Sequence, residues 1–184
     1  IENQANNDFL TGLFNRMRCE QDLGQFIRKT REKDATGALL YMGLDDFKHI
    51  NDGLGHQYGD ILLKAISHSL RRIDGIENTC YRMGGDEFVV IMKQMGTSMV
   101  AMMATTAAKV ARRIFKKPWF LKGEDYYCTI SMGIVYFPKD GETVEELVRK
   151  ADIALLSAKR GGKNRVEYYD GMDASSSYRR LDLE

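Results

Sequence analysis

Two short apolar runs separated by a pair of glycines constrain the fold more than any other feature of the sequence. Residues 80–83 and 88–92 are rich in residues that favour strands, and Gly-Gly-Asp-Glu lies between them at 84–87. Glycine adopts the positive φ angles of a tight turn at little cost, so this pattern predicts a β-hairpin. The turn also places two adjacent carboxylates at the hairpin tip.

Apolar residues at helical spacing alternate with short apolar runs along the rest of the chain. We expect helices over about 15–31, 58–73 and 97–115 and another from Thr143 onward, a loop between 42 and 58, and further strands over 38–42 and 126–136. Thr143 and Glu146 have the spacing of a capping box at the start of the last helix. Strands and helices mixed in this way predict an α+β fold, with a central, mainly antiparallel sheet packed by helices.

The length of 184 residues fits one domain, which we place at 1–170, with a linker or the start of a downstream segment at 171–184.

The formal charge of the chain is +1, so the chain has no excess of basic residues of the kind that nucleic-acid-binding domains carry. No apolar run reaches the ~18 residues that span a bilayer, and the three separated cysteines suggest neither disulfides nor zinc, so we expect a cytoplasmic location. Because the chain begins at Ile1, we also expect a fragment of a longer protein, which could be membrane-anchored.

Three segments carry polar residues suited to a phosphorylated ligand. The first is the hairpin tip. The second, residues 43–60, leads from a strand into a helix, where unpaired N–H groups attract anions, and Asn51 and Asp60 could pair with a guanine edge. The third, residues 159–165, carries four cations. Each segment also has an ordinary structural explanation, as a solvated turn, as turn and cap residues, or as a helix C-terminus complemented by positive charge.

Taken together, the motifs of this chain resemble the GGDEF family of diguanylate cyclases over about residues 8–169. They follow the family order and lie at 8–16 (DFLTGLFNR), 45–60 (DDFKHIND, GH and GD), 82–88 (RMGGDEF), 131–134 (SMGI) and 151–165 (AD to R). The resemblance implies a cyclase palm-like fold with a ferredoxin-like core. It also implies that two protomers face each other, each with one GTP, and condense the two nucleotides to cyclic di-GMP and pyrophosphate.

The same resemblance assigns roles to individual residues. Asp86 and Glu87 are the expected catalytic residues, and Mg²⁺ or Mn²⁺ is expected on these two side chains and the Leu44 carbonyl. Asn51 and Asp60 would hold guanine, while Lys48, Lys159 and Lys163 would meet the phosphates. The full set of expected substrate-binding positions is Phe47, Lys48, Asn51, His56, Asp60, Gly84, Gly85, Lys159 and Lys163.

Two departures from the family pattern leave the activity open. Family members usually have a metal-binding Asp where this chain has Gly43, and an inhibitory Arg-x-x-Asp where it has Gly75 and Asn78. The loss of a supporting residue commonly costs about 10–100-fold in metal affinity or activity, and the loss of a direct ligand should cost at least as much. We therefore weigh a diguanylate cyclase of full or reduced activity slightly ahead of a GTP-binding regulatory domain, and well ahead of a domain used only for protein contacts.

The end of the chain bears on the regulatory alternative. The polar stretch 174–177 and the segment 178–184 resemble the connection from such domains to an EAL-type cyclic di-GMP phosphodiesterase. An upstream sensor and a downstream EAL-type domain are therefore the expected partners in the full-length protein, together with GTP and a second copy of the domain. A regulatory role would consist of controlling the adjacent phosphodiesterase.

Overall fold

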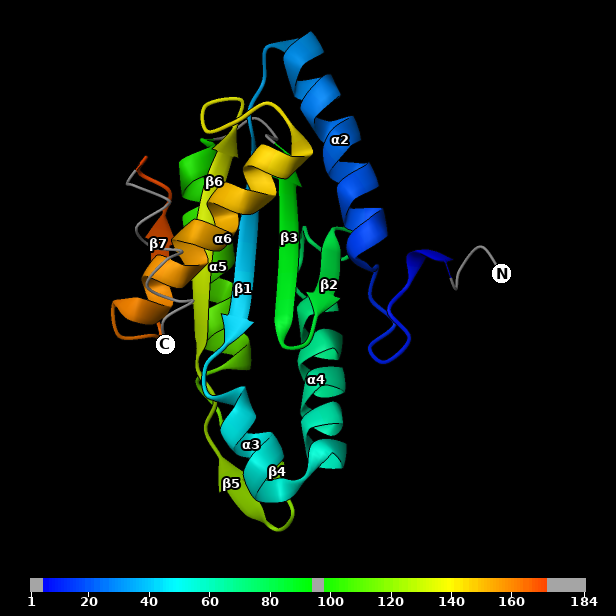
Figure 1. The fold of residues 1–184 in the computed structure, drawn as a ribbon, viewed down its shortest axis with the longest axis vertical. Coiled ribbons are helices and arrows are strands. Elements are labelled where there is room, and N and C mark those ends of the chain that lie inside the picture. The colour runs from blue at the N-terminus through cyan, green and yellow to red at the C-terminus, as the bar shows by residue number, and fades with distance from the viewer. Residues whose placement is uncertain (1–4, 94–97, 172–184) are drawn as a thin grey trace.

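A five-stranded sheet in the order β2-β3-β1-β6-β7 forms the centre of the molecule (Figure 1). The structure, a computed structural model, describes residues 5–93 and 98–171. All neighbouring strands are antiparallel except β6 and β7, which are parallel. The strands are β1 (Gly37–Leu44), β2 (Cys80–Gly84), β3 (Glu87–Lys93), β6 (Ile130–Phe137) and β7 (Val166–Tyr168), and β4 (Trp119–Leu121) pairs with β5 (Glu124–Tyr126) in a separate small sheet.

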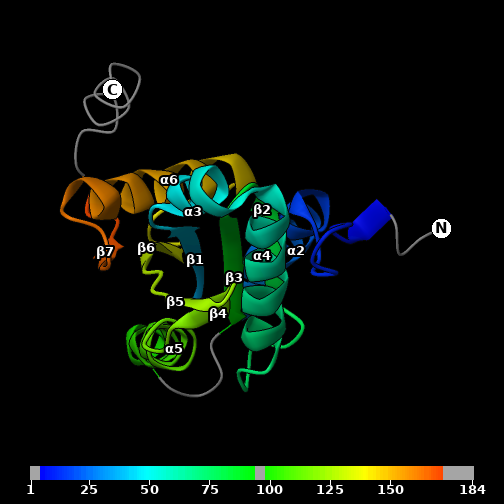
Figure 2. The same cartoon turned by 90° about the horizontal axis from the view of Figure 1, so that it is seen from below.

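Helices cover both faces of the central sheet (Figures 1 and 2). They are α2 (Arg16–Lys33), α3 (Phe47–Leu54), α4 (His56–Arg71), α5 (Met99–Ile114) and α6 (Val144–Arg160). Alternate residues of β1 enter two separate cores: Leu40 and Met42 pack with α4 and α5, whereas Leu39 and Tyr41 pack with α2 and α6. This alternation follows from the twofold period of a strand. The mainly antiparallel strand pairing and the helices packed on the sheet confirm the predicted α+β fold.

Most of the predicted elements are present, but the loop expected before the helix at 58–73 was wrong. Residues 47–54 form the separate helix α3, in which Phe47, Ile50 and Leu54 recur at helical spacing. The polar residues between them hide this short period in the sequence. Gly55, at φ 102°, separates α3 from α4.

The strand expected over 126–136 is also two elements. β5 ends at Tyr126 and β6 begins at Ile130, and between them the Thr129 carbonyl accepts from the Asp45 N–H at 2.9 Å. At the start of α6, the Thr143 side chain accepts a hydrogen bond from the Glu146 N–H, as one half of the predicted capping box requires. The Glu146 carboxylate instead accepts from Lys150 at 3.3 Å.

Some predictions fall on parts of the chain that are not described. Except for Gly171, the predicted linker at 171–184 lies outside the described residues, as does the expected helix start at Thr97. Within residues 5–93 and 98–171, no helix is both long enough and apolar enough to cross a membrane.

Helix α6 approaches the sheet closely at Gly133, in the middle of β6. A β-carbon at this position would lie 2.6 Å from the Ala151 carbonyl oxygen and would also collide with the Leu155 backbone nitrogen. Both atoms belong to the backbone of α6, so neither can move without moving the helix. Glycine at 133 therefore sets how closely α6 packs on the sheet.

We expect Gly133→Ala to lower the free energy of unfolding by about 1–3 kcal/mol, because overpacking a rigid backbone contact displaces α6. Gly53→Ala is the matched control, because Gly53 lies in α3 with nothing within 4 Å of an added β-carbon. The control should be neutral or stabilising by up to about 1 kcal/mol. Urea denaturation of both variants measures the difference, and an unchanged midpoint for Gly133→Ala would contradict the packing argument.

Candidate functional site

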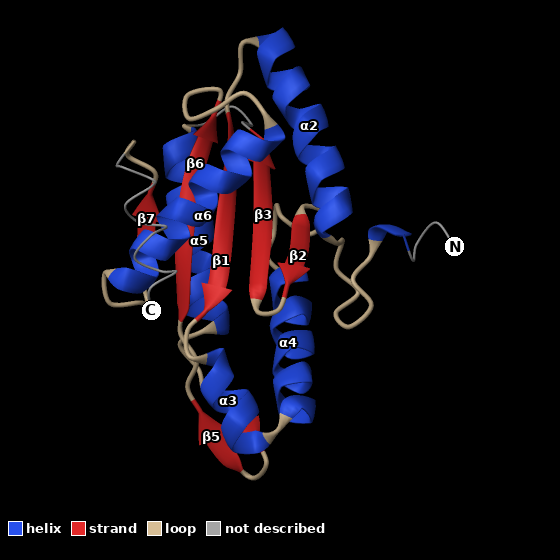
Figure 3. Ribbon diagram, viewed as in Figure 1, coloured by secondary structure: helices blue, strands red, loops and turns tan. Residues whose placement is uncertain are grey.

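The predicted site residues gather at one end of the sheet, where β1 ends, the β2–β3 turn lies and α3 begins (Figure 3). The Leu44 N–H, at the end of β1, donates to the Asp86 carbonyl in the hairpin turn at 3.2 Å. This bond continues the β1–β3 ladder to the tip. The hairpin carboxylates are therefore fixed beside the last residues of β1.

The hairpin turn has the backbone that its glycines predict. Gly84 and Gly85 have φ angles of 137° and 52°, and Gly84 pairs with Glu87 across the turn. Arg82, for which no role was predicted, donates to the Gly85 carbonyl at 2.8 and 3.1 Å and to the Asp8 carboxylate at 3.0 Å. Arg82 thus holds the turn against the segment that precedes α2.

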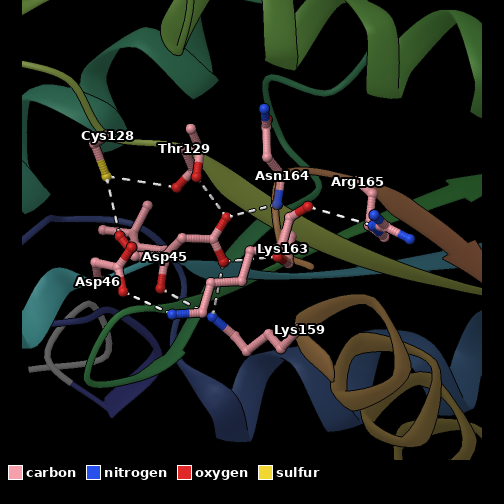
Figure 4. A network of polar contacts seen from close by, with 10 residues as sticks. Asp45, Asp46, Cys128, Thr129, Lys159, Lys163, Asn164 and Arg165 are labelled. Atoms are coloured by element: carbon pink, nitrogen blue, oxygen red, sulfur yellow. Dashed lines mark hydrogen bonds and ion pairs between the residues drawn. The ribbon is translucent and has the colours of Figure 1, made fainter. Parts of the chain in front are cut away.

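Asp45, directly after β1, is a buried carboxylate at the centre of a polar network (Figure 4). The residue is 2% exposed and accepts from the Ser131 and Thr129 hydroxyls, both at 2.6 Å, and from the Asn164 N–H at 2.9 Å. Lys159 Nζ lies 3.3 Å from its Oδ1 atom. Burial acts to raise the pKa of Asp45, but the hydrogen bonds and the lysine charge outweigh burial and hold the pKa below its usual value.

This network joins three parts of the chain that are distant in sequence. Asp45 follows β1, Thr129 precedes β6 and Ser131 lies within it, and Asn164 lies in the turn after α6. The sequence motifs include Asp45 in the segment 45–60, but they did not predict this network. Its one sequence signal was that Asp45 and Ser131 both lie in recognised motifs.

The two hairpin carboxylates have different surroundings. Burial raises the pKa of the Asp86 carboxyl, and the charge of Lys159 opposes that shift. The Glu87 carboxylate accepts from the Tyr41 hydroxyl at 3.1 Å, and burial also raises its pKa. Because Tyr41 belongs to the core formed with α2 and α6, Glu87 faces that side of the sheet.

Lys159, at the end of α6, contacts the carbonyl that was predicted to bind metal. Its Nζ atom donates to the Leu44 oxygen at 3.0 Å. Within residues 5–93 and 98–171, no group of three or more His, Cys, Asp or Glu side chains is arranged to hold a metal ion. In this arrangement the residues do not fit a divalent ion, because an ammonium group already lies on the expected ligand. The expected binding of Mg²⁺ or Mn²⁺ is untested, and the contact of Lys159 with Leu44 disfavours it.

The predicted guanine contacts lie on α3 and α4. Phe47 and Asn51 pack against Gly59, where a β-carbon would collide with the Asn51 side chain. The Asn51 Oδ1 atom is buried and has no hydrogen-bond partner among the described residues. Asp60 is exposed in the first turns of α4. The proximity of α3 to α4 therefore depends on Gly59.

The remaining predicted residues are less closely connected. Lys48 and His56 are exposed, and Lys163 forms a surface ion pair with Asp46 at 2.7 Å. A cavity of about 310 Å³ lies between α3 and β5, lined by His49, Ile50 and Tyr127 among others. None of the expected substrate-binding residues lines this cavity. The structure thus groups Lys159 with Leu44, and Phe47 with Asn51, but leaves Lys48 and His56 as separate surface side chains.

The fold and the hairpin define a cyclase palm-like domain, and comparison with known proteins identifies its family. The chain matches the family described as diguanylate cyclase, GGDEF domain, over residues 5–165, and it belongs to that family. It is 35% identical over 179 residues to the bifunctional diguanylate cyclase/cyclic di-GMP phosphodiesterase MucR of Pseudomonas aeruginosa, covering 97% of this chain and 26% of MucR. The protein is therefore a GGDEF domain of cyclic di-GMP signalling, and the chain spans only about a quarter of that relative.

Solved structures agree with this assignment. The GGDEF domain of YfiN from Pseudomonas aeruginosa matches with a TM-score of 0.82 at 28% identity, covering 96% of this chain and 99% of that one. The GGDEF domain of DgcB from Caulobacter crescentus, solved in complex with c-di-GMP, matches with a TM-score of 0.80 at 28% identity. The DgcB match covers 90% of this chain and 96% of that one.

We expect Asp45→Asn to lower the free energy of unfolding by about 2–4 kcal/mol at neutral pH, because an amide presents N–H groups to donors that need an acceptor. The pKa of Asp45 in the folded state lies below its unfolded value, which is near 3.8. Ionised Asp45 therefore stabilises the fold fully above the unfolded pKa, and this stabilisation is lost as the pH falls through the lower folded pKa. The difference between wild type and variant should therefore shrink below about pH 4.

Urea denaturation at several pH values checks this expectation. Asp46→Asn is the control, since the Asp46 carboxylate forms an exposed ion pair with Lys163. Such pairs contribute about 0–1 kcal/mol. An equal loss of unfolding free energy in the two variants would contradict the claim that the buried network of Asp45 stabilises the fold.

Proposed function

We propose that this domain binds GTP across the end of the sheet and acts in cytoplasmic cyclic di-GMP signalling as a regulatory domain with weak or no cyclase activity. In the longer protein it would control an adjacent EAL-type phosphodiesterase in response to GTP and an upstream sensor. The observation that carries this proposal is the contact of Lys159 with the Leu44 carbonyl beside Gly43, the position where the family resemblance leads us to expect a metal-binding carboxylate. Family membership supports the link to GTP.

Guanine recognition follows from the chemistry of α3 and α4. The Asp60 carboxylate can accept from the ring N–H and the exocyclic amine of guanine, whereas adenine offers no matching pair of donors at that edge. Asn51 has an amide that can donate to the guanine carbonyl, and its buried oxygen lacks a partner among the described residues. Asn51 and Asp60 together would therefore favour GTP over ATP.

Phosphate binding follows from the positions of the cations. The first N–H groups of α3, at Phe47 and Lys48, precede the intrahelical hydrogen bonds and can meet an anion. Lys159 and Lys163 reach the same end of the sheet from α6 and its following turn, as their contacts with Leu44 and Asp46 indicate. A triphosphate would then lie between the start of α3 and the end of α6.

An active diguanylate cyclase is the second candidate, and it is favoured by the retention of both hairpin carboxylates. Asp86 and Glu87 lie beside the end of β1, where the reacting phosphate of GTP would lie. In that case two protomers would face each other with one GTP each. Incubating the purified chain with GTP and Mg²⁺ or Mn²⁺ and quantifying cyclic di-GMP separates the two candidates, since multiple turnovers would establish the cyclase.

We expect Asp60→Ala to weaken GTP binding by about 10–100-fold, the loss of one or two hydrogen bonds to a charged group, without strengthening ATP binding. Isothermal titration with both nucleotides measures this selectivity. Asp52→Ala is the matched control, because Asp52 is an exposed carboxylate on α3 outside the predicted contacts. Equal affinities of the wild-type chain for ATP and GTP would exclude the guanine assignment.

We also expect cyclic di-GMP to bind this domain weakly. The family's inhibitory Arg-x-x-Asp is replaced by Gly75 and Asn78, so no guanidinium fork is available there for a phosphate or a guanine edge. The Gly75 N–H instead donates to the Glu77 carboxylate at 3.1 Å, and φ at Gly75 is 94°, which disfavours any other residue. Isothermal titration should show no saturation at micromolar cyclic di-GMP, and tight binding with two ligands per site would contradict this expectation.

A further inference from the structure

The ammonium group of Lys159 lies among the oxygen atoms that a divalent cation would need. It is 3.0 Å from the Leu44 carbonyl oxygen and 3.3 Å from Asp45 Oδ1. Its charge also acts on the Asp86 carboxyl, where it opposes the effect of burial on the pKa. A positive charge of the protein itself is therefore directed at the end of β1 and at the hairpin turn, as Figure 4 shows for the β1 side.

Gly43 provides the room for this side chain. A β-carbon at position 43 would lie 3.0 Å from Lys159 Cε and 3.3 Å from Nζ, closer than such contacts normally are. The stem of Lys159 thus runs along the bare backbone of β1. Glycine at position 43 therefore has two effects. It leaves the site without the carboxylate expected from the family pattern, and it lets the ammonium group reach the Leu44 carbonyl.

A divalent ion and this ammonium group cannot share the position. An ion bound to the Leu44 carbonyl would lie about 2.0–2.6 Å from that oxygen, within a few ångströms of Nζ. Like charges at such a separation repel strongly in a partly buried site. Mg²⁺ is usually held by one or two carboxylates together with substrate phosphates, and without a carboxylate at position 43 it would depend on Asp86, Glu87 and a carbonyl that Lys159 already contacts.

We propose that the Lys159 ammonium takes the place of a divalent cation in this domain, so that the domain excludes the metal and binds guanine nucleotides as metal-free anions. The described residues engage two of the three N–H donors of Lys159, on Leu44 and Asp45, and a phosphate oxygen would take the other. The nucleotide part of this proposal rests on the proposed function. The exclusion of the metal rests on the contacts of Lys159 and Gly43.

The first experiment tests metal exclusion on the nucleotide-free chain. Mn²⁺ is titrated into the protein and free Mn²⁺ is followed by electron paramagnetic resonance. We expect no stoichiometric binding to the wild type, and stoichiometric binding to the Gly43→Asp/Lys159→Met double variant, which restores a carboxylate and removes the ammonium group. Stoichiometric Mn²⁺ binding by the wild type, or none by a folded double variant, overturns the proposal.

A control variant on the same helix separates this site from a general effect of charge. Lys150 also lies on α6, but its Nζ donates to the Asp140 carbonyl at 2.6 Å, away from β1. Lys150→Met removes the same charge and should leave the exclusion of Mn²⁺ unchanged. If Lys150→Met gains Mn²⁺ binding like that of the double variant, net charge rather than the position of Lys159 is responsible, and the proposal fails.

The second experiment measures GTP affinity by isothermal titration in excess EDTA and in excess Mg²⁺. We expect the two dissociation constants to agree within about threefold, whereas Mg²⁺-dependent tightening of about tenfold or more would overturn the proposal. Absence of GTP binding under both conditions would refute the proposed function and the nucleotide part of this proposal. The Mn²⁺ titration would then still decide whether Lys159 excludes the metal.

Discussion

The buried carboxylate of Asp45 is the interaction on which the site end of this domain depends. A charge that is 2% exposed is tolerated only when hydrogen bonds and an opposite charge compensate for its lost hydration. Here Thr129, Ser131, Asn164 and Lys159 provide that compensation. Because these partners come from β6 and from the end of α6, the network fixes the two elements against the end of β1.

Close packing of α6 on the sheet makes this network possible. Gly133 lets the α6 backbone approach β6, and the same approach brings the last turn of α6 within reach of Leu44 and Asp45. Gly43 then leaves space for the Lys159 stem. The position of one ammonium group thus depends on two glycines in neighbouring strands, and the electrostatics of the site follow from backbone packing.

The sequence predicted most of the fold because its signals were local. Two glycines between apolar runs gave the hairpin, and helical spacing gave α2, α4, α5 and α6 to within a few residues. Short elements were the exceptions. The eight-residue helix α3 was predicted as a loop, and the three-residue strand β7 was not predicted, because their stability comes from packing and pairing with distant residues.

For the site, the sequence by itself determined which residue types are present: the hairpin carboxylates Asp86 and Glu87, the candidate guanine contacts, and glycine instead of a carboxylate at position 43. It also determined the family, because the motifs keep their order and spacing. Only the tertiary structure decided that Asp45 is a buried structural charge and that Lys159 lies on the Leu44 carbonyl. These contacts join residues separated by more than 80 positions, and such proximity depends on how α6 and β6 pack on β1, which no local pattern encodes.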